Sequence, residues 1–354
     1  MRVGERSRFL PLTARFVSQR IGVHYTLEGI AGTESEQSTS GTWPVNLRTA
    51  HSQPRSGAKR LRRPLDILLS VTSSSDDATG PPGWRWDPSL YAGSAPHYAR
   101  GRVAYPAEAV DALTTALRLD GSGRLLDVGC GPGSLTLLLA PHFAQAVGVD
   151  ADPGMLDEAA RLAEELGVTN VEWRRLRAEE LPADLRLFRV VTFAQSFHWM
   201  DRRLVAAIAR GMLEPGGAVV HVHATTHEGM GGDAALPHPR PPREAIGDLV
   251  QRYLGPTRRA GQGVLAAGLP DNEDAVYRQA GFSGPQRIDL PGRTVERTTD
   301  EVVSSVYSLS SAAPHLFGNR VEPFDKELRA LLARTSRTGM FSEEMRPVSL
   351  DIWR

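Results

Sequence analysis

Apolar residues in the middle of the chain follow two different periods. Short apolar runs bounded by turn residues alternate there with longer segments in which apolar residues recur at helical spacing. Short runs of this kind are typical of buried strands, whereas the longer periodic segments are typical of amphipathic helices. The pattern predicts strands at residues 124–128, 146–149, 171–175, 190–194 and 218–222.

Helices are predicted between these strands, at residues 134–143, 153–166 and 204–212, and a turn is predicted at 214–217. The second helix begins at Pro153, where the missing N–H costs nothing because a first-turn N–H has no partner. Strands that alternate with helices predict an α/β fold with a doubly wound, mainly parallel sheet. Right-handed crossovers then place a ligand crevice at the carboxyl ends of the strands.

The last third of the chain predicts two late strands, at residues 286–290 and 348–353, with helices before and between them. The helices are expected at 245–254, 273–280 and through most of 298–338. The complete prediction is a Rossmann-like, seven-stranded, mainly parallel sheet with helices on both faces. A helical insertion between the last two strands would form a cap over the carboxyl edge.

Residues 1–85 lack a sustained apolar period and are rich in Ser, Thr, Gly, Pro and Arg. Such a segment cannot bury enough apolar surface to offset the entropy of ordering, so we predict a disordered N-terminal tail. The basic run at 59–63 is interpreted as solvated. The domain is expected to span 86–354, with a cofactor-binding core at 106–225 and the cap and late strands at 226–354.

Charge and composition exclude several classes of function. The chain has 41 Lys+Arg and 41 Asp+Glu, which gives no global electrostatic reason to bind nucleic acid or an anionic membrane. The single cysteine, Cys130, excludes an internal disulfide framework and multi-cysteine metal sites. No apolar run approaches the length of a membrane span, and no secretory signal pattern opens the chain. We expect a soluble, cytoplasmic monomer or homodimer.

The most informative stretch is a glycine loop directly after the first predicted strand. Its motif places Asp127 two residues before Gly129, and Gly131 and Gly133 follow at alternate positions. Glycines at a strand-to-helix turn let a ligand approach the backbone closely. The dinucleotide pattern would require glycine at Ser134. Asp127 would repel a pyrophosphate but suits a cationic amino-acid ligand, although a nucleotide-cofactor oxidoreductase stays an alternative.

A second carboxylate, Asp150, ends the second strand about twenty residues after the loop, where an acidic side chain can accept both hydroxyls of a ribose. An aspartate at this place can also cap the next helix. Asp152, directly before Pro153, fits that capping role better. Asp150 is therefore predicted to bind a ribose.

These motifs resemble a known family. The Asp127-to-Gly133 motif, the strand ending in Asp150 and the segment 178–182 are similar to class I S-adenosylmethionine-dependent methyltransferases. The segments 98–106 and 194–201 resemble the small-molecule branch that includes trans-aconitate methyltransferase-like proteins. The resemblance implies S-adenosylmethionine as the cofactor and a small-molecule acceptor.

For the methionine end of the cofactor, the resemblance implies that the backbone of Gly129, Gly131 and Gly133 passes beside the ligand. Asp127 would orient the ammonium group, directly or through water. Gln195, just past the fourth strand, would line this end.

For the adenosine end, the resemblance implies that Asp150 holds the ribose, while Ala151 and Met155 flank the adenine ring. Ala178 would offer its backbone N–H to adenine, with Glu179 nearby.

The chain departs from the family pattern at Arg177, where many relatives have an aspartate that accepts from the adenine amino group. Glu179 or a backbone carbonyl would have to replace it. Tyr98, Arg102 and Tyr105 lie in the segment that folds over the cofactor in the family. Arg102 is expected either to pair with the cofactor carboxylate or to remain a surface arginine.

His198 is the candidate general base, because it follows the fourth strand and histidine titrates near neutral pH. The alternative is that His198 and Trp199 only shape the pocket floor. A base is needed only when the acceptor must lose a proton.

Another group, His221, His223 and His227 with Glu228, has spacing that a metal site could use. The paired acidic ligands of a magnesium site are missing, so we expect no metal. The function predicted is methyl transfer from S-adenosylmethionine to a small organic acceptor, through an oxygen. The alternatives are the oxidoreductase and a non-catalytic cofactor-binding scaffold.

Overall fold

The computed structural model describes residues 87–257, 259–260, 263–264 and 273–354. The predicted tail at 1–85 lies outside the described residues, and so does the basic run at 59–63. Within the described part of the chain, no helix combines the length and the apolar character that a membrane crossing requires.

The centre of the fold is a seven-stranded sheet in the order β3-β2-β1-β4-β5-β11-β8. Strands β1 to β5 are parallel, and β11 runs antiparallel to both of its neighbours, β5 and β8. The predicted Rossmann-like, mainly parallel sheet is confirmed. Its strands are β1 (Arg124–Val128), β2 (Gln145–Asp150), β3 (Val171–Arg175), β4 (Phe188–Ala194), β5 (Leu213–His223), β8 (Gln286–Leu290) and β11 (Val348–Trp353).

Helices cover both faces of this sheet because successive strand residues point to opposite sides. Leu125 belongs to the core cluster beneath α3 (Glu108–Leu117) and α4 (Ser134–Leu139). Leu126 belongs to the cluster beneath α6 (Arg202–Gly211) and α8 (Glu273–Gln279). Both leucines are fully buried.

Short segments at the strand ends position the site. Helix α5 (Pro153–Leu166) follows β2, and Asp152 caps it as predicted by accepting a hydrogen bond from Met155 N. The 3₁₀ turns are η1 (Ala140–His142), η2 (Ala178–Glu180) and η3 (Phe197–Trp199).

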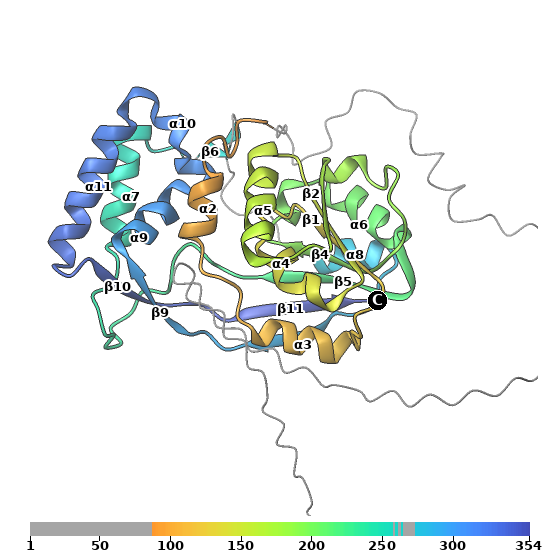
Figure 1. Cartoon of the computed structure of the whole chain (residues 1–354). Helices are drawn as coiled ribbons and strands as arrows, with labels where there is room; N and C mark the ends of the chain where they lie inside the picture. Colours follow the sequence, from red (N-terminus) through yellow and green to blue (C-terminus); the bar gives the residue numbers. More distant parts are fainter. Residues whose placement is uncertain (1–86, 258, 261–262, 265–272) are drawn as a thin grey trace, which may run out of the picture. The chain divides into compact units, whose positions relative to one another are not determined.

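The helical cap between the last two strands of the sheet is confirmed. Figure 1 shows α7, α9, α10 and α11 gathered together, and their buried side chains form one apolar cluster. Helix α7 joins the cap although it precedes β8 in the sequence. The cap elements are α7 (Arg243–Leu254), α9 (Thr299–Tyr307), η4 (Ser310–Ala312), α10 (Pro314–Phe317), η5 (Gly318–Arg320) and α11 (Val321–Thr335).

A helix before the sheet, α2 (Ala95–Gly101), packs against α9 of the cap (Figure 1). The two backbones approach closely at Gly101, where a Cβ atom would lie only 2.3 Å from the backbone of Ser304. The chain that leads into the sheet is thereby attached to the cap.

The structure also differs from the predicted elements. The helix expected through 143 ends at Leu139, and β5 continues through the turn expected at 214–217 with a register break against β4. Strands β9 (Thr294–Thr298) and β10 (Met340–Glu344), which pair antiparallel, were not predicted. Their pattern is unusual for strands because polar side chains, including Glu343, are buried in them. Another pair comprises β6 (Arg259–Ala260) and β7 (Gly263–Val264).

Candidate active site

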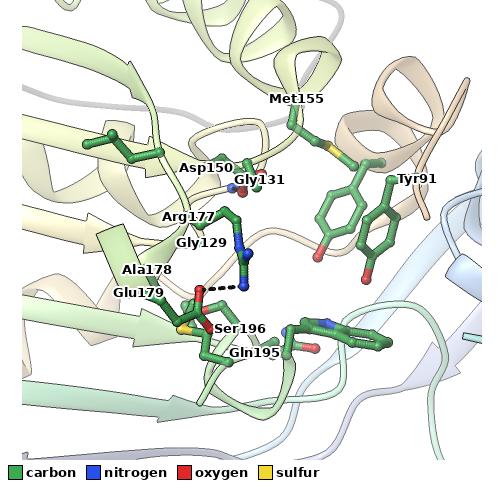
Figure 2. Close-up of a pocket in the computed structure, with 16 residues that line it drawn as sticks. Tyr91, Gly129, Gly131, Asp150, Met155, Arg177, Ala178, Glu179, Gln195 and Ser196 are labelled. Carbon is green, nitrogen blue, oxygen red and sulfur yellow. Dashed lines mark hydrogen bonds and ion pairs between the residues drawn. The ribbon is translucent and has the colours of Figure 1, made fainter. Parts of the chain in front are cut away.

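A pocket opens at the carboxyl ends of β1, β2 and β4, where the parallel-sheet topology predicts a ligand crevice (Figure 2). It holds about 720 Å³ of space, with open solvent at its mouth included. It is lined by Tyr91, Tyr98, Gly129, Gly131, Asp150, Ala151, Met155, Leu176, Arg177, Ala178, Glu179, Ala194, Gln195, Ser196, Trp199 and Met200.

The glycine loop forms one wall of the pocket, and its geometry requires glycine. Gly129 has φ 68°, and a Cβ atom there would lie 2.5 Å from Ser196 Cβ. Gly131 opens into the pocket, with nothing within 4 Å of the place where its Cβ would be. Gly133 serves packing instead, because a Cβ there would lie 2.6 Å from Trp173 of β3. Two of the three predicted loop glycines therefore line the pocket.

Asp150 stands at the end of β2 with its carboxylate beside the loop (Figure 2). Its Oδ2 accepts from Gly131 N at 2.8 Å, and its Oδ1 accepts from Asp152 N at 2.9 Å. Burial raises the pKa of Asp150 to about 6, against the opposing effect of these backbone hydrogen bonds. Asp150 thus joins the loop to β2 and presents a carboxylate to the pocket.

One wall of the pocket is mostly apolar and is formed by Ala151, Met155 and Ala178. An apolar wall of this kind suits a flat aromatic ring. Arg177 and Glu179 add an ion pair at its rim, with Arg177 Nη2 3.4 Å from Glu179 Oε2 (Figure 2). Glu179 Oε1 also accepts a hydrogen bond from Asp201 N at 2.9 Å. Glu179 therefore has partners within the protein, one of them the residue at which the chain departs from the family pattern.

Gln195 lies just past β4 with φ 56°, a left-handed conformation that non-glycine residues seldom adopt. Its Nε2 is 3.3 Å from both Tyr105 Oη and Thr226 Oγ1. Strained backbone of this kind concentrates at functional sites, and the two hydroxyls hold the Gln195 amide in place.

Aromatic side chains close the remaining side. The Tyr91 ring meets Tyr98 edge to face at 6.3 Å and Trp199 at 6.2 Å. Sequence reasoning missed Tyr91, which precedes α2 outside any family motif. The only sequence signal for Tyr91 is a tyrosine in the segment that leads into α2.

Asp127 lies behind the pocket rather than in its wall. It is 1% exposed, and it accepts hydrogen bonds from Thr136 Oγ1 at 2.6 Å and Thr192 Oγ1 at 2.7 Å. Burial raises its pKa. Its carboxylate thus joins α4 to β4 beneath the loop, and the prediction that it orients the cofactor ammonium group, directly or through water, stays a prediction.

Arg102, which the sequence predicts either to pair with a cofactor carboxylate or to remain a surface arginine, is not one of the lining residues. Its guanidinium stacks over the Tyr98 ring at 4.4 Å and donates to Ser308 Oγ at 2.9 Å and to the Ser308 carbonyl at 3.0 Å. Arg102 thus connects α2 to the residue that follows α9. Tyr98, the other predicted cover residue, does line the pocket.

His198, the candidate base, is half-buried in η3 and is not one of the lining residues. Its ring lies 4.7 Å from the ring of Trp199, which does line the pocket. The charge of a protonated His198 would contribute to lowering the pKa of His221.

The histidines considered as metal ligands separate into two groups. His221 and His223 stack with ring centroids 4.3 Å apart, whereas His227 Nε2 lies 3.6 Å from Glu228 Oε1 and His227 Nδ1 lies 3.5 Å from Arg102. Burial lowers the pKa of His221 to about 3, so this imidazole is neutral. The first pair meets a carboxylate that the spacing did not indicate, that of Glu273.

Comparison with known proteins finds similarity to methyltransferases in the core. Residues 125–217 match the family of methyltransferase domains. An uncharacterized methyltransferase of Mycobacterium tuberculosis is 39% identical over 150 residues, which are 42% of this chain and 57% of that protein. A ubiquinone biosynthesis O-methyltransferase of Cereibacter sphaeroides is 38% identical over 98 residues, 27% of this chain and 39% of that protein.

Among solved structures, the YcgJ protein from Bacillus subtilis aligns with 70% of this chain and 98% of its own length, at 17% identity and a TM-score of 0.42. The chain spans little more than half the length of the mycobacterial relative. The matched domain supports a class I S-adenosylmethionine-dependent methyltransferase, and it implies S-adenosylmethionine as the cofactor.

Proposed function

We propose that this chain transfers a methyl group from S-adenosylmethionine to a small organic acceptor, through a carboxylate or hydroxyl oxygen. One observation carries the proposal. Within the methyltransferase-domain residues, the glycine loop and Asp150 share one pocket at the carboxyl ends of β1, β2 and β4. A glycine loop and a strand-end carboxylate together suit a nucleoside that carries an amino acid.

In this proposal the Asp150 carboxylate accepts the ribose hydroxyls, Ala151 and Met155 contact the two faces of the adenine ring, and Ala178 donates its backbone N–H to it. Gly129 and Gly131 pass beside the methionine portion. Each of these six residues is a lining residue of the pocket, which supports the assignment.

The bound cofactor supplies an electrophilic methyl group on a sulfonium, and its in-line displacement requires chiefly alignment and exclusion of water. We assign alignment to Gln195, whose amide is held by Tyr105 and Thr226. Tyr91 and Trp199 exclude water from the same end.

The acceptor is proposed to be small because α2, which packs against α9 of the cap, contributes Tyr98 to the pocket wall. The resemblance to trans-aconitate methyltransferase-like proteins favours a carboxylate, which needs no base. A hydroxyl acceptor would need one, and His198 in η3 is the candidate.

Calorimetric titration of the full chain with S-adenosylmethionine and with S-adenosylhomocysteine tests the cofactor. We expect micromolar binding that is tighter for the product, and no binding of reduced nicotinamide dinucleotide. A folded sample that binds only the nicotinamide would establish the oxidoreductase alternative. Binding of S-adenosylmethionine without turnover on any acceptor would favour the scaffold.

A panel of small carboxylic acids and phenols, assayed for methylation, tests the acceptor. With a phenol, His198→Ala should reduce turnover about 100-fold with unchanged cofactor affinity, whereas with a carboxylate it should change turnover little. The matched control is His142→Ala in η1, on the segment that precedes β2. Equal small effects of both variants on a phenol would remove His198 as the base.

A further inference from the structure

Outside the pocket, a cluster of metal-ligating side chains lies on the face of the sheet covered by α6 and α8. His221 and His223 occupy alternate positions of β5, so both project from this face. Asp351 of β11 stands opposite His221 in the register, and Arg287 of β8 stands opposite Asp351. Glu273, the first residue of α8, meets the two histidines. Three strands and one helix therefore converge at one point.

The distances within this cluster are close to those between ligands of one metal ion. Glu273 Oε2 lies 3.5 Å from His221 Nδ1 and 4.0 Å from His223 Nδ1. The three ligand atoms all lie within 4.8 Å of one another. Around zinc, ligand atoms at bonds of ~2.1 Å in a tetrahedron are separated by about 3.4 Å. The three separations therefore exceed this value by at most about 1.4 Å.

A second carboxylate orients one of the histidines. Asp351 Oδ2 lies 3.1 Å from His223 Nε2, and Asp351 is itself held by Arg287 through two contacts of 2.7 and 2.6 Å. A histidine that donates from one ring nitrogen to a carboxylate keeps its lone pair on the other nitrogen. That other nitrogen, Nδ1, is the one that faces Glu273. This carboxylate–histidine pairing is the usual support of metal-bound imidazole.

His221 is fixed by packing. It is 5% exposed, with its ring 5.5 Å from that of Phe197 and 5.9 Å from that of Tyr277. The Tyr277 hydroxyl lies 3.2 Å from His221 Nδ1, within the cluster. His223, in contrast, has a side chain 39% exposed, so an ion can reach the cluster from solvent.

We propose that His221, His223 and Glu273 bind a divalent transition-metal ion, with Zn²⁺ the best match, and that Asp351 is the carboxylate that positions His223. Two imidazoles and one carboxylate are zinc ligands, whereas Mg²⁺ and Ca²⁺ take oxygen ligands. Three protein ligands leave a coordination position for water or another molecule. The site goes beyond the proposed methyl transfer, since none of its residues lines the cofactor pocket.

The test uses the full chain without a histidine tag, stripped with a chelator and then titrated with zinc chloride by calorimetry. Absorption of bound Co²⁺ provides a spectroscopic readout of the ligand field. We expect one ion per chain. His223→Ala and Glu273→Gln should each weaken Zn²⁺ binding at least ~100-fold, and Asp351→Asn should weaken it about 10- to 100-fold.

One variant serves as a matched control. His238 lies outside the proposed metal site, with its Nε2 3.8 Å from Glu296 Oε1. The His238→Ala variant should bind Zn²⁺ like the wild type. Circular dichroism of the stripped variants confirms that they fold.

The proposal is overturned if the wild type binds no ion, or if both His223→Ala and Glu273→Gln bind as the wild type does. Should His223→Ala fail to fold, Glu273→Gln decides the question alone, because amide and carboxylate have the same shape. Titrating the stripped protein with S-adenosylmethionine keeps the two proposals distinguishable. Cofactor binding without metal binding contradicts only the metal site, and the reverse contradicts only the methyl-transfer proposal.

Discussion

The cofactor pocket and the cap are built in opposite ways. The sheet side of the pocket is assembled from short segments that follow β1, β2, β3 and β4, so each wall on that side is local in the sequence. The cap packs around an apolar cluster, and it is joined to the β9–β10 pair by charged side chains from segments far apart, Arg243 on α7, Arg297 on β9 and Glu343 on β10. A local motif can therefore be recognised in the sequence, whereas the interior of the cap depends on the complete fold.

The charged groups that join the cap to the β9–β10 pair have hydrogen-bond partners within the protein. Glu343 accepts from Arg243 Nη2 at 2.8 Å, from Arg297 Nη1 at 3.0 Å and from Gly229 N at 3.0 Å. Arg297 also donates to the carbonyls of Gly101 and His227. Two guanidiniums and one carboxylate thus bind α2, α7 and the β9–β10 pair together. A buried charge is tolerated only when it is paired in this manner.

The largest effect is expected where this cluster is broken. Glu343→Ala leaves Arg297 buried, at 3% exposure, without its carboxylate partner. Loss of one member of a buried ion pair costs about 3–5 kcal/mol, which urea unfolding should detect as a lower free energy of unfolding. Glu344→Ala, whose side chain is 42% exposed beside Arg240, is the control and should cost under about 1 kcal/mol. Equal losses from both variants would show that the buried ion pairs contribute no more to the free energy of unfolding than the exposed pair.

The pocket should respond in affinity rather than in folding. Asp150→Ala removes the carboxylate that is proposed to accept the ribose hydroxyls, and it should weaken S-adenosylmethionine binding by about 1–3 kcal/mol, the scale of hydrogen bonds to a charged group. Calorimetry provides the measurement. Asp157→Ala, exposed on α5, is the control and should leave the affinity unchanged. If Asp150→Ala binds as tightly as the control, Asp150 is not a ribose ligand.

The sequence predicted most of the core because the core elements are local. Strands 124–128, 171–175, 286–290 and 348–353 and helix 153–166 have the predicted bounds, since apolar periodicity and caps such as Asp152 lie within each element. The position of Asp150 beside the glycine loop could be predicted for the same reason, since it is the last residue of the strand that pairs with β1.

What the sequence did not predict depends on tertiary partners. The β9–β10 pair lacks a clear apolar alternation, because its buried positions include the charged pair Glu343 and Arg297 beside Phe341. Glu273 reaches His221 only through the packing of α8 on the sheet. The hydrogen bonds from Thr136 and Thr192 withdraw Asp127 from the pocket wall, and neither threonine belongs to the glycine motif.

A change in pH sharpens the contrast, because the pocket contains a carboxyl group with a pKa near neutrality. The pKa of Asp150 is raised to about 6 in the free protein, and ribose hydroxyls would donate to the ionised form. Cofactor affinity should therefore be constant above pH 6 and should decrease as the pH falls through 6. The decrease is about tenfold between pH 7 and pH 5.

Calorimetry across this range provides the measurement, and Asp150→Asn provides the control. An amide does not titrate, so the affinity of this variant should be low and nearly independent of pH between 5 and 7. A wild-type profile as flat as that of Asp150→Asn would contradict the assignment of the titrating group.

The smallest effect is expected at Arg102, where the two regions meet. The sequence pattern allowed Arg102 to bind the cofactor carboxylate, whereas the structure has its guanidinium on Ser308 and over Tyr98. Arg102→Lys keeps the charge but loses the planar contacts, at a cost of about 1 kcal/mol in the free energy of unfolding. Cofactor affinity should change less than about threefold, since the lost partner lies in the cap.

Arg100→Lys on the same helix is the matched control, because Arg100 is exposed, and neither stability nor affinity should change in it. A loss of cofactor affinity of tenfold or more in Arg102→Lys, without a change in the free energy of unfolding, would show that Arg102 contacts the cofactor. A loss of stability alone identifies Arg102 as the residue through which the cover helix is attached to the cap. The cover over the pocket would then depend on the folding of the cap, and the contrast between a local pocket and a long-range cap would apply only to the sheet side of the site.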